Sequence, residues 1–231
     1  MIDLGVITAA LPEFVRGVQV TLLLLVISLS AGLLLSVPLA VARASRRPWL
    51  RGPVWLYTYV LRGTPLLVQL FLIYYGLAQF EWIRQTSAWA LLKSPWFCTW
   101  LAFTLNTSAY TTEILAGAIS ATPHGEVEAA RSLGMSGGAV LSRIVLPGAL
   151  RRALPQYGNE AVQMLHATTI ASTVTLVEVT RVARDVYANS FLTTEAFGTA
   201  AVIYGVLTAL LVGGFRLLER RYLRHLRPAA A

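Results

Sequence analysis

The sequence predicts an all-α membrane protein with five transmembrane helices, and three observations lead to this fold class. Apolar residues make up 56% of the 231-residue chain and charged residues only 13%, about half of the roughly 25% that soluble domains carry. The mean hydropathy is +0.62. The apolar residues form long runs, and arginines gather in the segments between them. A chain of this length can form a single transmembrane domain, which we expect to cover residues 1–231.

The first expected span is residues 17–42, which carry no charged side chain. At 1.5 Å per residue this run reaches about 39 Å, enough to cross the hydrocarbon core of a bilayer with some tilt. A cleaved signal peptide is the alternative. The run is too long for the apolar region of such a peptide, and its basic cluster follows it instead of preceding it.

The remaining expected spans follow in chain order. Arg62 interrupts the second span and Glu113 the third, while the fifth is uncharged. The fourth is rich in Thr and Ser, which suits a polar interior better than contact with lipid. These four spans are residues 53–79, 95–120, 156–178 and 196–215.

The positive charges predict the orientation. One set of connecting segments, together with the C-terminal end, carries thirteen arginines, and the opposite set carries five cations. Because cytoplasmic loops hold the excess of Lys and Arg, we expect the N-terminus outside and the C-terminus in the cytoplasm. The thirteen are Arg43, Arg46, Arg47, Arg51, Arg131, Arg143, Arg151, Arg152, Arg216, Arg220, Arg221, Arg224 and Arg227; the five are Arg16, Arg84, Lys93, Arg181 and Arg184.

The expected cytoplasmic loop at residues 121–150 is too polar to span a bilayer, yet its pattern is helical. Thr122 followed by Pro123 predicts a helix start, with the Thr as N-cap and the Pro in the first helical position. The apolar residues of this helix recur on one expected face: Val127, Ala130 and Leu133.

The same loop predicts a sharp turn and a second helix. Gly134 can end the first helix in a left-handed conformation. Ser136 can begin the second, which we expect to stop near Pro147. From the pattern alone, two interpretations stay open: a helix pair lying on the membrane surface, or a docking element for a cytoplasmic partner.

In this loop Glu128-Ala129-Ala130 is followed after three residues by Gly134, after nine more by Ile144, and one residue later by Leu146-Pro147. This spacing resembles the EAA motif of ABC-importer permeases. In that family the loop forms coupling helices that dock on the ATP-binding subunit, so the resemblance favours docking. It implies a MetI-like permease fold and an ATPase-coupling role for seven residues: Glu128, Ala129, Ala130, Gly134, Ile144, Leu146 and Pro147.

The resemblance extends over nearly the whole chain. The segments YTYVLRGTPLLVQLFLIYYG (57–76) and TLNTSAYTTEILAGAI (104–119) look like the second and third spans of polar amino-acid permeases. The segments ALPQYGNEAVQMLHATTIA and FRLLERRYLRHLRP are similar to one branch, the M-type permeases of histidine/lysine/arginine/ornithine importers.

Two intramembrane charges are open to two interpretations. Charged side chains inside a bilayer are costly and usually face the bundle interior or a cavity. Arg62 and Glu113 fall at similar depth, so they can form a structural ion pair; alternatively, Glu113 helps a cationic substrate to cross. Polar residues of the third and fourth spans are candidates for a substrate pathway or for helix packing. The pathway candidates are Asn106, Tyr110, Glu113, Gln163, Thr168, Thr169 and Ser172.

Several kinds of chemistry have no support in the sequence. No Walker A loop is possible, because Lys93 is the only lysine and lacks the glycine-rich context. The three histidines are far apart and the single cysteine, Cys98, lies in an apolar run, so we expect neither a metal site nor a catalytic site. The net charge of +8 is divided among loops, which argues against nucleic-acid binding.

The resemblance implies a permease subunit of an ATP-driven amino-acid importer in the inner (cytoplasmic) membrane. It further implies two ATP-binding subunits, which would bind ATP and Mg, a second related permease subunit and a periplasmic substrate-binding protein, with membrane lipid around the spans. Basic amino acids are the expected substrates. The alternatives are another polar amino acid, an ion-coupled secondary transporter, or a membrane scaffold without transport.

Overall fold

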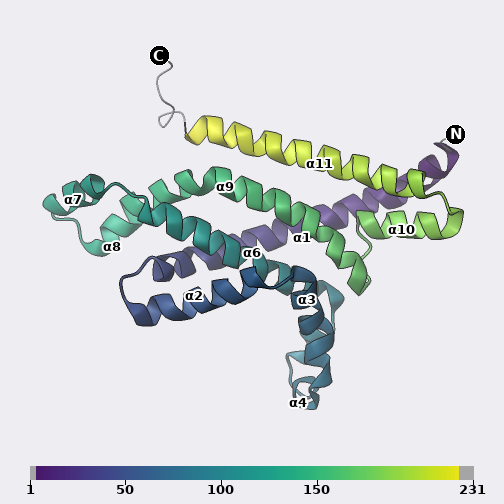
Figure 1. Ribbon diagram of the computed structural model, residues 1–231, viewed down its shortest axis with the longest axis horizontal. Helices are drawn as coiled ribbons and strands as arrows, with labels where there is room; N and C mark the ends of the chain where they lie inside the picture. The colour runs from purple at the N-terminus through teal and green to yellow at the C-terminus, as the bar shows by residue number, and fades with distance from the viewer. Residues whose placement is uncertain (1–3, 224–231) are drawn as a thin grey trace.

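A computed structural model describes residues 4–223 of the chain, which form helices and connecting turns with no strand among them. The predicted all-α class is therefore confirmed. Long helices run side by side along the longest axis of the molecule (Figure 1). Arg224 and Arg227, counted in the charge asymmetry, lie outside the described residues. The long helices are α1 (Leu4–Arg43), α6 (Pro95–Ser120), α9 (Leu146–Ala167) and α11 (Thr193–Tyr222).

The core lies where α6 packs against α1 and α9, and α11 covers the outer side of α9. Apolar side chains at the centre, such as Leu24, Phe103 and Leu165, are fully buried. Helix α1 crosses α6 at close range at Gly32. The space there is so small that a methyl group on residue 32 would overlap the Thr107 methyl. A glycine at this crossing lets the two helices approach more closely than any larger residue would allow.

By length and apolar composition, two helices of the described chain could each cross a membrane: Gly5–Arg43 and Thr193–Tyr222. A third crossing is added if the two segments of a sharply bent pair, Pro48–Gly63 and Leu66–Gln79, count as one span. Helices α6 and α9 carry many polar side chains, which lowers their apolarity. The five-span arrangement stays a prediction.

The second expected span is broken instead of continuous. Helix α2 (Pro48–Gly63) is followed, after an abrupt bend of 104°, by α3 (Leu66–Phe71), the π-helical turn η1 (Leu72–Gly76) and the 3-10 turn η2 (Leu77–Gln79). In Figure 1, α3 and the short helix α4 (Glu81–Arg84) project away from the bundle. Another short helix, α5 (Trp89–Leu92), leads into α6.

The cause of the break is Pro65. Proline has no N–H to donate to the carbonyl of Leu61 one turn earlier, and it forces Thr64 into an extended conformation. The side-chain amide of Gln69 replaces the missing donor: its Nε2 donates to the Leu61 carbonyl at 2.7 Å and to the Thr64 carbonyl at 3.0 Å. Asn106 of α6 in turn donates to Gln69 Oε1 at 3.1 Å, so the bend is fixed to the bundle.

The fourth expected span also differs at both ends. Helix α9 begins at Leu146, before the predicted start, and continues past Ala167 as the 3-10 segment η4 (Thr168–Val174). Thr175 then adopts a left-handed conformation with φ 73°, which ends the helical run. Helix α10 (Val179–Ser190) follows and packs against both α1 and α11.

Candidate coupling loop and translocation cavity

The first helix of the predicted cytoplasmic loop is α7 (His124–Ser132), and Gly134 ends it as expected. The φ of Gly134 is +78°. Its N–H donates to the Arg131 carbonyl at 2.9 Å, and the Met135 N–H donates to the Ala130 carbonyl at 3.2 Å. These two bonds are those of a Schellman motif, in which glycine is favoured because it adopts positive φ without strain.

The start of α7 differs slightly from the expectation. The helix begins at His124, with Pro123 at the N-cap position and no side-chain cap. The Thr122 hydroxyl does not cap the helix; instead it accepts a hydrogen bond from Arg152 Nη2 at 2.7 Å. The expected apolar face is only partly buried: Ala130 is 3% exposed, whereas Leu133 is 84% exposed.

The second loop helix, α8 (Gly137–Val140), begins as predicted at Ser136, whose hydroxyl accepts from the Ala139 N–H. The expected stop near Pro147 is wrong. Five π-helical residues, η3 (Leu141–Val145), join α8 directly to α9. Pro147 follows directly on this π-helical turn, and the helical backbone continues through the proline into α9.

The loop is closed at its base by Arg152. Its guanidinium donates to the Ala118 carbonyl from Nε at 3.3 Å and from Nη2 at 3.2 Å, besides the bond to Thr122. These bonds connect the start of α9 with the end of α6. The loop therefore forms a self-contained unit with Glu128, Ala129 and Leu133 on its surface.

Beside this closure, α6 and α9 line a cavity of about 650 Å³ that also reaches α2. A second cavity of about 370 Å³ shares Tyr110, Glu160 and Gln163 with the first. Four predicted pathway residues therefore line these two cavities: Asn106, Tyr110, Glu113 and Gln163.

The other three pathway candidates belong to neither lining. The hydroxyl groups of Thr168, Thr169 and Ser172 each donate to a carbonyl one turn earlier, at 2.6 to 2.8 Å. Thr168 and Ser172 are also buried. These hydrogen bonds are therefore local, within the helical segment that carries the three residues.

A polar row on α9 lines the first cavity, and sequence reasoning had named only Gln163 of its four members, Gln156, Asn159, Glu160 and Gln163. Their spacing of three, four and seven residues places them on one face of a helix. Glu160 is 9% exposed and accepts a hydrogen bond from the Thr107 hydroxyl at 2.8 Å. The helical periodicity of these polar residues was the signal that could have found them.

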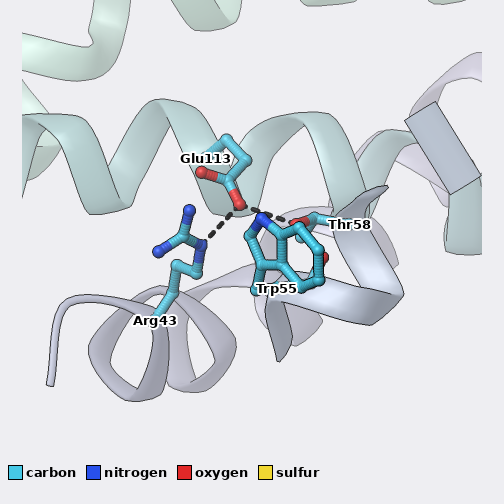
Figure 2. Close-up of polar contacts among 4 residues, drawn as sticks. All are labelled: Arg43, Trp55, Thr58 and Glu113. Carbon is cyan, nitrogen blue, oxygen red and sulfur yellow. Dashed lines mark hydrogen bonds and ion pairs between the residues drawn. The ribbon is translucent and has the colours of Figure 1, made fainter. Parts of the chain in front are cut away.

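Glu113 forms its ion pair with a different residue from the one expected. Figure 2 shows its carboxylate between Arg43 and Thr58, which donate to Oε1 at 2.7 and 2.6 Å. The predicted partner Arg62 instead lies over the Tyr110 ring, 5.3 Å from the centroid, and lines the same cavity. Glu113 thus connects the end of α1 with α2 and α6.

Comparison with known proteins identifies the kind of protein that carries these features. The family of binding-protein-dependent transport system inner membrane components matches residues 32–224. The chain belongs to this family. It is a permease subunit of an ABC importer, and its all-helical fold is that of such permeases.

Individual permeases are similar to this chain over most of its length. The histidine/lysine/arginine/ornithine transport system permease protein HisM of Escherichia coli (strain K12) is 46% identical over 93% of this chain and 90% of its own length. The nopaline transport system permease protein NocM of Agrobacterium fabrum is 43% identical over 89% of this chain and 86% of its own length. The crystal structure of an amino acid ABC transporter with histidines has a TM-score of 0.84 and 32% identity, covering 96% of this chain and 99% of that one.

Proposed function

We propose that the permease moves basic amino acids, namely histidine, lysine, arginine and ornithine, across the inner membrane. The identity to HisM over most of both chains supports this substrate class. The similarity to NocM supports a second candidate, nopaline, as a substrate. An ion-coupled mechanism has no support, because the family depends on a binding protein.

The partners in this proposal are those of a complete importer. A second, related permease subunit pairs with this one, and two ATP-binding subunits bind ATP and Mg. A periplasmic binding protein delivers the substrate. None of these partners requires a nucleotide site in the present chain.

One observation carries the mechanism. The segment from α7 to η3 is inserted between α6 and α9, and these two helices line both cavities. Movement of the loop by the ATP-binding subunits is therefore passed to both helices at once. We infer an alternating-access cycle in which this movement opens the cavities first to one side of the membrane and then to the other. Glu128, Ala129, Ala130, Gly134, Ile144, Leu146 and Pro147 form or support the docking surface.

The proposed orientation places the N-terminus and residues 80–94 outside and the coupling loop in the cytoplasm. Single cysteines at Ser45 and Ser136, in a chain whose Cys98 is replaced, test it with an impermeant thiol reagent. Neither position should react from outside intact cells. Labelling from outside at either position would show that the orientation is the opposite of the proposed one.

Uptake into proteoliposomes tests the transport function. The assembled importer, with ATP supplied to its ATP-binding subunits, should accumulate radiolabelled histidine and arginine. Nopaline and glutamine in the same panel separate the basic-amino-acid proposal from its alternatives. Accumulation of glutamine or nopaline without any basic amino acid would refute the proposed substrate class.

A further inference from the structure

A polar pocket of about 290 Å³ lies apart from the coupling loop, where the end of α1, the start of α2 and the end of α6 meet. Two guanidinium groups, from Arg43 and Arg51, face it together with one carboxylate, that of Glu113. Small side chains, including Ser45 and Ser120, complete the lining. The pocket is therefore positively charged and polar.

The single carboxylate does not cancel this charge. Oε1 of Glu113 already accepts from Arg43 Nε and from the Thr58 hydroxyl. Among residues 4–223, Arg51 forms no ion pair within 4.0 Å. Arg46 and Arg47, on the adjoining turn, are exposed and add further positive charge.

The location of these cations is unfavourable for the helix itself. Arg47 and Arg51 flank the N-terminus of α2, and no acidic residue lies in its first turn. The positive end of the helix macrodipole disfavours cations there and favours an anion. An anion bound beside Arg51 would reduce the repulsion among the arginines and the repulsion between the arginines and the positive end of α2.

Aromatic side chains on α2 indicate where this pocket lies relative to the membrane. Trp49 is 66% exposed, Trp55 49% and Tyr59 65%, and the rings of Trp55 and Tyr59 stack with centroids 5.2 Å apart. Exposed Trp and Tyr beside basic residues are typical of the boundary between lipid and water.

We infer that this pocket binds the phosphate of an anionic phospholipid, with Arg51 and Arg43 as the cationic contacts. Basic pockets between transmembrane helices on the cytoplasmic side are known to hold anionic headgroups. The inference rests on the orientation proposed above, which thiol labelling at Ser45 tests separately from lipid binding. The lipid would lie beside the Arg43–Glu113 ion pair and so contact the junction of α1, α2 and α6.

Native mass spectrometry of the purified importer, titrated with phosphatidylglycerol or phosphatidylcholine, tests this inference. We expect preferential binding of phosphatidylglycerol, and about five-fold weaker binding after Arg51→Gln, since one basic residue near the surface contributes roughly 1 kcal/mol. Arg51→Lys keeps the charge and should retain most of the binding. Arg51 is exposed, so neither change should disturb folding.

Arg220→Gln is the matched control, because it removes an exposed cation near the end of α11, outside the pocket lining. This variant should bind phosphatidylglycerol as the unmodified importer does. An equal loss in Arg51→Gln and Arg220→Gln would show a general charge effect and overturn the inference. Displacement of the lipid by millimolar inorganic phosphate would also overturn it, because the ligand would then be the free anion.

Discussion

The ion pair between Arg43 and Glu113 should stabilise the permease through a coupling that a double-mutant cycle can measure. The variants are Arg43→Gln, Glu113→Gln and the combination of both. Each single change leaves one charged group without its partner at the junction of α1, α2 and α6. The double change removes both charges, so it should cost less than the sum of the single changes.

The magnitude follows from the partial burial of the pair. The side chains of Arg43 and Glu113 are 18% and 22% exposed, with 2.7 Å between Nε and Oε1. The free energy of unfolding lost when this ion pair is broken should therefore lie between two values. An exposed pair contributes below about 1 kcal/mol, and breaking a buried pair costs roughly 3–5 kcal/mol. We expect each single change to lower the free energy of unfolding by about 2 kcal/mol, with a coupling of about 1 kcal/mol.

Unfolding in mixed micelles, followed by tryptophan fluorescence as denaturing detergent increases, measures these free energies. Arg62→Gln provides the control, since Arg62 lies over Tyr110 and forms no ion pair within 4.0 Å among the described residues. Because Arg62 acts on Glu113 only through longer-range attraction, its coupling to Glu113→Gln should be clearly smaller than that of Arg43→Gln. Strict additivity between Arg43 and Glu113, with a clear coupling between Arg62 and Glu113, would refute the structural assignment.

Three further substitutions test the coupling loop, the helix crossing and the bend. Gly134→Ala should lower transport and destabilise the loop by roughly 1–2 kcal/mol, because a β-carbon opposes the left-handed conformation; uptake and limited proteolysis measure this. Gly32→Ala should lower the detergent concentration at the unfolding midpoint, since the new methyl overlaps that of Thr107. Gln69→Leu should cost about 1–3 kcal/mol in the same assay, because the Leu61 carbonyl keeps only the longer bond from Asn106 and Asn106 loses the Gln69 acceptor.

Each of these substitutions has a matched control. Gly137→Ala introduces a methyl into open space without positive φ, so transport should not change; equal losses at both loop glycines would argue against the Schellman turn. Adding Thr107→Ser to Gly32→Ala removes the overlapping methyl and should restore stability, and a lack of recovery would count against the crossing. Gln79→Leu lies on an exposed part of the same segment, so an effect as large as that of Gln69→Leu would exclude the proposed bend.

The long apolar helices could be predicted because burial and lipid contact both require uninterrupted apolar runs. Helix α6 has the same bounds as the third expected span and α11 includes the fifth, while their crossing of the membrane stays a prediction. The bend before Pro65 was missed because the hydropathy of a segment carries no information about the direction of its backbone. A proline within a span does indicate a possible break. The continuation past Pro147 was missed because we took the proline as a helix stop, whereas the π-helical turn η3 leads the helical backbone directly into α9.

The candidate site was predictable where local chemistry determines it. The turn at Gly134 depends on neighbouring residues alone, and the structure confirms it. The partner of Glu113 depends on tertiary packing, because Arg43 is 70 residues away at the end of another helix. Counting Arg43 only as a loop charge concealed this contact. Three-dimensional proximity of this kind leaves no spacing signal in one sequence.

The hydrogen bonds from Arg152 to Ala118 and Thr122 have a consequence for the thermodynamics of subunit assembly. They hold the two ends of the loop together within this chain, so its shape does not depend on a partner for closure. A protein that docks on a preorganised surface loses little conformational entropy in ordering it. Assembly should then show the small heat-capacity change of rigid-body docking, without the larger change that accompanies folding on binding.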